Sequence, residues 1–184
     1  MCIRDSPERV PMSSRPAPLL RTLSAAVLVA ALSAAAAQAK TLRTADQGDA
    51  VSMDPHSLNE TTQLGFTGNV YEPLVTRDAQ LRLAPGLATS WKQVSPTVWR
   101  FELRRGVSFH DGSPFTADDV VFSFQRAADP GSDMRGVVGP VKEVRRIDDH
   151  TVEIVTNAPV PILPDSLTSF YMICLLYTSP SPRD

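Results

Sequence analysis

The sequence predicts an α/β fold, and three segments carry that prediction. Residues 97–103 alternate apolar and charged side chains, which is the two-residue period of a strand with one buried face. Residues 116–128 begin with a helix-capping signature and continue as an apolar stripe at helical spacing. Residues 141–155 hold two strand-like runs on either side of the polar turn 148–150, which is typical of a β-hairpin.

Shorter elements are expected before these segments. The pattern predicts a strand over residues 40–47, a helix weakened by two glycines within 60–71, a short strand at 74–76 and a turn at 85–86. In the strand 97–103, Trp99, Phe101 and Leu103 form the apolar face. Residues 107–109 are expected to form another short strand, followed by a turn over 110–114.

The helix after this turn has the strongest local signal. Thr116 is a suitable N-cap, Asp119 lies three residues later as in a capping box, and Phe115 can pack on Val120. The expected apolar stripe consists of Val120, Val121, Phe124, Ala127 and Ala128. After the hairpin, the proline-rich residues 157–164 lead into a possible short helix over 162–167.

Composition excludes several classes of protein. Hydrophobic residues make up 42% of the 184 residues and charged residues 21%, so the chain can form a packed core. Lys and Arg number 18 against 20 Asp and Glu, which gives a net charge of −2 and lacks the basic excess of a nucleic-acid-binding protein. The 16 prolines disfavour a helical bundle.

Both ends of the chain resemble translated sequencing adapter. Residues 1–6 can be written as the codons ATG TGT ATA AGA GAC AG, and the second frame of the reverse complement encodes Cys-Leu-Leu-Tyr-Thr-Ser, which is the sequence of residues 174–179. We therefore exclude residues 1–6 and 174–184 from functional reasoning. Both cysteines, Cys2 and Cys174, lie in these ends, so no disulfide is expected, and the natural sequence is expected to continue beyond Ile173.

An export signal is predicted from Met12 onward. Arg15 and Arg21 give a positive start, residues 23–32 form a short apolar run, and Ala37-Gln38-Ala39 fits a cleavage site after Ala39. The alternative is a membrane anchor, but the run is shorter than the roughly 20 residues that span a bilayer. We expect a soluble protein in a periplasm-like space.

No catalytic or metal-binding pattern stands out. The three histidines lie in predicted turns without the spacing of metal ligands, so turn-stabilising or solvated roles are favoured. The acidic pairs 118–119 and 148–149 are expected to be caps and turn formers rather than acid/base pairs. The aromatic side chains are expected in the core rather than stacked on a ligand: Trp91, Trp99, Phe101, Phe109 and Phe124. We therefore expect no catalytic residue, metal or cofactor.

One long stretch carries a family resemblance. The run Leu103 to Arg126, LRRGVSFHDGSPFTADDVVFSFQR, closely resembles the signature of the family 5 extracellular solute-binding proteins, which serve ABC importers. Flanking motifs match in order: MDPH from Met53, VYEPLV from Val70, LAPGLATSW from Leu83 and IDDHTV from Ile147. The resemblance covers nearly all of residues 41–170.

The resemblance implies a class II periplasmic-binding-protein fold, a two-lobed clamp that closes on its ligand, truncated here to the first part of lobe I plus an accessory domain. The implied division is residues 1–11 as adapter and residues before the start, 12–39 as signal peptide, 40–76 as the start of lobe I, 77–160 as the accessory α/β domain, 161–173 as the return towards lobe I and 174–184 as adapter.

The resemblance also suggests ligand-binding residues. Ligands of α/β folds bind beyond the carboxyl ends of strands, which by itself leaves Gly48 and Asp49 open as either a ligand site or an ordinary turn. In the family the loop after the first strand meets the ligand backbone, which points to Gln47, Gly48, Asp49 and Ala50, with Asp49 holding a ligand amine. Leu64 and Thr67 are expected to line the cleft.

The implied function is a periplasmic receptor that binds a small peptide or related solute and delivers it to an ABC permease and ATPase complex. We expect a monomer without nucleic-acid partners. Two alternatives remain: a secreted enzyme with catalytic residues beyond Ile173, and a signalling receptor or chaperone built on the same clamp.

Overall fold

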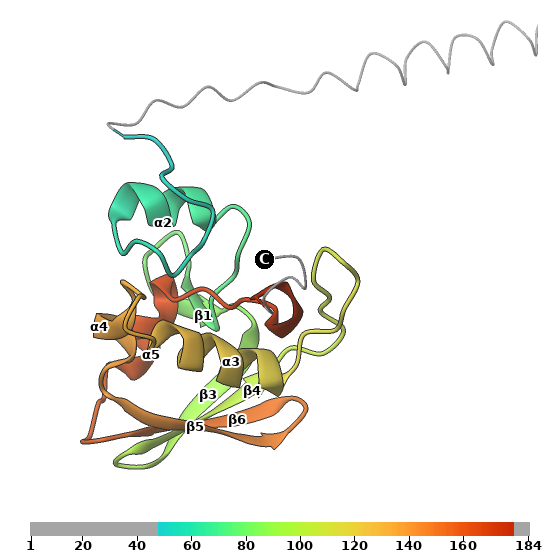
Figure 1. The fold of residues 1–184 in the computed structure, drawn as a ribbon. Helices are drawn as coiled ribbons and strands as arrows, with labels where there is room; N and C mark the ends of the chain where they lie inside the picture. Colours follow the sequence, from blue (N-terminus) through green and yellow to red (C-terminus); the bar gives the residue numbers. More distant parts are fainter. Residues whose placement is uncertain (1–47, 179–184) are drawn as a thin grey trace, which may run out of the picture. The chain divides into compact units, whose positions relative to one another are not determined.

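The computed structural model describes residues 48–178, so the predicted signal segment and the strand 40–47 lie outside the described residues. Figure 1 shows the elements. In chain order they are α2 (Thr61–Thr67), β1 (Val75–Arg77), β2 (Leu83–Pro85), β3 (Ala88–Ser95), β4 (Val98–Leu103), α3 (Ala117–Ala127), α4 (Arg135–Val138), β5 (Val141–Asp148), β6 (Thr151–Thr156), α5 (Leu163–Ser166) and two 3₁₀ turns, η1 (Leu167–Ser169) and η2 (Leu175–Thr178).

The main sheet is antiparallel, with strand order β3-β4-β6-β5, and α3 packs across one of its faces (Figure 1). Trp91, Phe101 and Val152 are register partners on neighbouring strands, so their side chains share that face. Phe101 and Val152 are fully buried, and Phe124 of α3 belongs to the same core. The α/β class, the strand at 97–103 and the hairpin around 148–150 are confirmed.

The opposite face of the sheet carries a row of charges. Lys92, Arg100, Glu153 and Arg145 are successive register partners across the four strands. Arg100 and Glu153 form an ion pair at 2.6 Å between N and O atoms. The charged positions predicted in the strand 97–103 therefore pair across strands, as expected for cross-strand neighbours on one face.

Strand β3 was not predicted from the sequence. Of its eight residues, only Trp91 has a large apolar side chain that faces the core. The register of its pairing with β4 also shifts at both ends. Bulges of this kind shift the alternation of side chains between faces, which hides the two-residue period. The predicted strand at 107–109 is wrong, because this segment forms only an isolated bridge between Ser108 and Pro114.

The predicted helix is confirmed as α3, with two differences in its pattern. The Thr116 N–H donates to the Asp119 carboxylate at 2.9 Å, so this half of the capping box is formed. Ala128 is exposed, whereas Ser123, which was not in the predicted stripe, is fully buried. The Ser123 hydroxyl donates to the Asp119 carbonyl at 2.7 Å and accepts the Ile173 N–H at 3.0 Å.

The hairpin turn between β5 and β6 lies against the beginning of α3. The Ala117 N–H donates to the Asp149 carbonyl at 2.9 Å, and this satisfies one of the free N–H groups of the first helical turn. Arg146 forms ion pairs with both Asp118 and Asp149. The two acidic pairs therefore serve as helix-start and turn residues, in agreement with the prediction.

The strands β1 and β2 form a separate hairpin that joins the main sheet through Gly86. The Gly86 N–H donates to the Leu74 carbonyl, and a Cβ atom at Gly86 would lie only 2.5 Å from the Pro73 carbonyl oxygen. A residue with a side chain cannot fit at this close approach of two backbone segments. Among residues 48–178, no helix is long and apolar enough to cross a membrane.

Candidate functional site

The predicted ligand loop, residues 47–50, begins at the edge of the described chain. Gln47 lies outside the described residues, Gly48 and Asp49 are exposed, and Ala50 is half-buried. The Ala50 N–H donates to Oδ1 of Asp49 at 2.8 Å. The Asp49 carboxylate thus lies at the surface, bonded to the neighbouring Ala50 N–H. Contact between this loop and a ligand stays a prediction.

Helix α2 lies beside the ligand loop. A Cβ atom at Gly48 would be 3.7 Å from the methyl group of Thr62, in ordinary van der Waals contact. Leu64 is half-buried, whereas Thr67 is fully buried and its hydroxyl donates to the Gln63 carbonyl at 3.0 Å. Of the two α2 residues expected to line a cleft, the structure leaves only Leu64 partly exposed.

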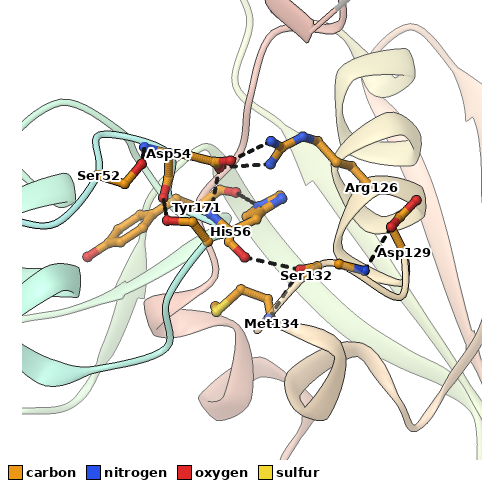
Figure 2. A network of polar contacts seen from close by, with 10 residues as sticks. Ser52, Asp54, His56, Arg126, Asp129, Ser132, Met134 and Tyr171 are labelled. Atoms are coloured by element: carbon orange, nitrogen blue, oxygen red, sulfur yellow. Dashed lines mark hydrogen bonds and ion pairs between the residues drawn. The ribbon is translucent and has the colours of Figure 1, made fainter.

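The segment that follows the ligand loop is anchored on α3 by an ion pair. Both guanidinium nitrogens of Arg126 bond the Asp54 carboxylate, at 2.8 and 2.6 Å (Figure 2). The Asp54 N–H donates to the Ser52 hydroxyl, and the same carboxylate accepts the His56 N–H at 2.9 Å. This bidentate arrangement fixes orientation as well as distance.

His56 is the centre of this junction and is not solvated. It is 1% exposed, and its ring stacks on Phe170 with centroids 5.1 Å apart. Nε2 lies 3.0 Å from the Tyr171 carbonyl oxygen, which can only accept, so Nε2 carries the proton (Figure 2). The His56 carbonyl accepts the Ser132 hydroxyl and the Asp133 N–H. The solvated alternative for His56 is therefore wrong. The residue lies in a turn, as predicted, but its ring bonds the distant Tyr171 rather than the turn itself.

Burial and charge set the protonation states of the junction. The Arg126 guanidinium hydrogen-bonded to Asp54 lowers the pKa of that carboxyl below its ordinary 3.8. Burial lowers the pKa of His56 below its ordinary 6.5, and the nearby Arg126 charge acts in the same direction. At neutral pH the junction therefore combines an ion pair with a neutral imidazole.

Tyr171 connects α2 with the returning chain. Its hydroxyl donates to the carbonyl of Leu64, in the middle of α2, at 3.0 Å. A Cβ atom at Gly68 would lie 2.5 Å from this hydroxyl oxygen, so glycine lets the ring approach the helix end. Burial raises the pKa of the Tyr171 phenol, so its hydroxyl remains a donor at neutral pH.

One hollow is lined by Gly68 and Tyr171, and two others flank this arrangement. Of these two, one of about 260 Å³ is lined by polar side chains of the junction, including Asp54, His56 and Arg126. The other, of about 340 Å³, lies between residues 68–72 and 107–110. The exposed ligand-loop residues line none of these hollows. Within the described part of the chain, no group of three or more His, Cys, Asp or Glu side chains could hold a metal ion.

Sequence reasoning missed the partners that build this site. The segment 48–57 is contacted by three residues to which the sequence analysis gave no role: Gln63, Arg126 and Tyr171. No periodic pattern in the sequence distinguishes these three residues from their neighbours. Asp54 and His56 were found from the sequence, as part of the MDPH motif and as a predicted turn. Their partners were not, since Arg126 is 72 residues from Asp54.

Comparison with known proteins identifies the family. The family model for bacterial extracellular solute-binding proteins, family 5 Middle, matches residues 82–182. The chain is 31% identical over 165 residues to the periplasmic oligopeptide-binding protein OppA of Escherichia coli (strain K12), which covers 79% of this chain and 29% of that protein. The chain belongs to the family 5 extracellular solute-binding proteins.

Two further family 5 proteins support this assignment. The dipeptide-binding protein of Escherichia coli (strain K12) is 32% identical over 176 residues, covering 79% of this chain and 32% of that protein. The structure of Haemophilus influenzae OppA in complex with RPPGFSPFR matches with a TM-score of 0.63 and 27% identity, over 67% of this chain and 28% of that chain. The chain spans about a third of the length of the relatives that it matches.

The comparisons also settle the fold class. The structural relatives are two-lobed periplasmic binding proteins, and the mixed strands and helices of residues 48–178 are an α/β piece of that fold. The predicted class is therefore confirmed. The domain boundaries predicted at residues 76, 160 and 173 stay predictions.

Proposed function

We propose that this chain is the N-terminal part of a periplasmic receptor that binds peptides and delivers them to an ABC permease and ATPase complex. The observation that carries the proposal is the family membership together with the similarity to OppA over 79% of the chain. The names of the curated relatives describe oligopeptide and dipeptide binding, which favours peptides within the family.

The predicted location is consistent with this role. OppA of Escherichia coli is periplasmic by name, and residues 12–39 have the charge and apolar pattern of a cleaved signal. The proposal therefore places the mature protein in the periplasm, beginning at Lys40. Residues 40–76 would contribute the start of the ligand-binding lobe, and residues 77–160 the accessory domain.

The proposed ligand contacts come mainly from main-chain atoms. An extended peptide can pair its backbone with an exposed loop, so affinity does not depend on the identity of each side chain. Gly48 and Asp49 are exposed as this role requires, and the Asp49 carboxylate would bond the ligand amine. Such a charge-assisted hydrogen bond strengthens when a closing clamp excludes water.

Thermal unfolding tests the proposal in the longer protein that contains this chain. Trialanine and a nonapeptide are added separately, and the melting temperature is measured across a range of concentrations. A ligand that binds only the folded state stabilises it by about 2.7 kcal/mol at one hundred times its Kd. We expect one bound peptide per protein and a concentration-dependent rise in melting temperature.

A matched variant separates specific binding from general stabilisation. Asp49→Asn keeps the size of the side chain but removes the charge proposed to hold the ligand amine. We expect it to weaken peptide binding about tenfold, since hydrogen bonds to charged groups contribute about 1.5–3 kcal/mol. A protein that shows no shift with either peptide would overturn the peptide assignment.

A further inference from the structure

The backbone just after the ligand loop is bonded to a buried side chain of α2. Gln63 is 1% exposed, and its Oε1 accepts the Val51 N–H at 3.1 Å. Its Nε2 donates to the Ser52 carbonyl. One side-chain amide thus satisfies a donor and an acceptor on two neighbouring residues of the segment.

The orientation of this amide is determined by its partners. A backbone N–H needs an acceptor and a carbonyl needs a donor, so only one of the two flips of the Gln63 amide satisfies both. Because the side chain is buried, losing either bond would leave a polar group without water as a replacement. The pairing therefore holds the segment in one position relative to α2.

Side-chain packing does not hold this part of the segment. The Val51 side chain is 80% exposed and Met53 is 50% exposed, so neither contributes much buried surface. The fixed points are Gln63 on α2 and, three residues after Val51, the Asp54 carboxylate bound to Arg126 of α3. Between these two fixed points the chain is short, and the exposed Gly48 and Asp49 and the half-buried Ala50 immediately precede it.

Helix α2 is itself held in place by hydrogen bonds, so it can fix the position of the loop. The Gln63 carbonyl accepts the buried Thr67 hydroxyl, and the Tyr171 hydroxyl bonds the Leu64 carbonyl. Tyr171 belongs to the returning chain, whose backbone also bonds His56. The hydrogen bonds of Gln63 therefore hold the loop, which has little side-chain packing, in a defined position relative to α2.

We propose that Gln63 is a positioning residue for ligand binding, acting through the backbone of Val51 and Ser52 on the ligand loop. The inference rests on the proposed function, because it assumes that residues 47–50 meet the ligand. A loop that is held in its binding position before the ligand arrives loses less conformational entropy on binding. Loss of the Gln63 bonds should therefore weaken binding without any change in a residue that contacts ligand.

The test compares two replacements in the longer protein that contains this chain. Gln63→Met keeps a similar volume and removes both hydrogen bonds. Gln63→Glu keeps an acceptor for the Val51 N–H but loses the donor to the Ser52 carbonyl. Gln125→Met, at an exposed position of α3, controls for the replacement itself.

Two measurements are made on each variant. Hydrogen exchange of the Val51 amide, resolved to the residue in the unliganded protein, reports whether the bond is present. We expect at least a tenfold loss of protection in Gln63→Met and retained protection in Gln63→Glu. The Kd for trialanine, measured by calorimetry, should rise about tenfold in Gln63→Met, less in Gln63→Glu, and not in Gln125→Met.

The outcomes distinguish this inference from the proposed function. Unchanged Val51 protection in Gln63→Met would overturn the inference, because the bond would then not hold the segment. Lost protection with an unchanged Kd would also overturn it, since the position of the loop would not matter for binding. If the parent protein binds no peptide at all, the proposed function fails and the positioning role falls with it.

Discussion

At the scale of single residues, the most informative side chain is His56. It lies in a turn, yet it is buried, stacked on Phe170 and bonded to the Tyr171 carbonyl. Among the described residues its Nδ1 has no hydrogen-bond partner, and burial together with the nearby Arg126 charge lowers the pKa of the ring. The sequence placed it in a turn and disfavoured a metal-ligand role, but did not predict its burial.

Acid should destabilise the protein through this residue. Burial places the pKa of His56 below its ordinary 6.5, so the unfolded chain takes up the proton first as the pH falls. The contribution of the neutral His56 to the free energy of unfolding is therefore complete well above pH 6.5, and it declines as the pH falls below 6.5. Because the pKa of Asp54 is also lowered, the protein loses further stability as the pH falls below the ordinary pKa of 3.8.

The measurement is urea unfolding of the full-length protein at pH 7 and pH 5. His56→Gln keeps a donor for the Tyr171 carbonyl but cannot titrate, so its stability should fall less between the two pH values than that of the parent. His110→Gln, on the exposed loop 108–114, should behave as the parent does. Equal pH dependence in His56→Gln and the parent would contradict this explanation.

At the scale of elements, local signals predicted those that depend on neighbours in sequence. Helix α3 has its cap and most of its apolar stripe within twelve residues, and the β5–β6 hairpin has its turn between its strands. Strand β3 was missed because bulges interrupt the alternation of its side chains between the two faces. The strand expected at 107–109 is wrong because Ser108 forms only an isolated bridge with the nearby Pro114 instead of joining a sheet.

The start of α3 provides a test at this scale. Thr116→Ala removes the hydroxyl that lies 3.2 Å from the Asp119 carboxylate, and it should cost about 1 kcal/mol of stability. Asp119→Ala should cost more, because that carboxylate is 5% exposed and also accepts the Thr116 N–H. Thermal unfolding measures both, and peptide preference should not change. A larger loss of stability in Thr116→Ala than in Asp119→Ala would contradict this ranking of the two capping-box residues.

At the scale of the whole molecule, apolar side chains remain exposed just after the ligand loop, in α2 and just after α2. Val51, Met53, Phe66 and Val70 are between 38% and 80% exposed. Exposed apolar side chains within one short stretch of the chain favour an interface with another body. The relatives are about three times as long as this chain, which offers a source for that body.

Residues 40–173 expressed alone should therefore associate and should not bind peptide measurably. Light scattering measures the association, and calorimetry with trialanine measures the binding. The full-length protein, under the same conditions, should be monomeric and bind. Monomeric residues 40–173 with peptide affinity equal to that of the full-length protein would show that the ligand site is complete within this segment.

The amino-acid sequence by itself determined the α/β class, the capped helix, the hairpin and the family resemblance, because each depends on short-range patterns or on a long ordered run of motifs. The tertiary structure decided how the segment after the ligand loop is held. Gln63, Arg126 and Tyr171 bond that segment from separate elements. Contacts of this kind depend on how distant backbone segments meet in space, and a polar side chain has the same appearance in a sequence whether it is solvated or buried with a partner.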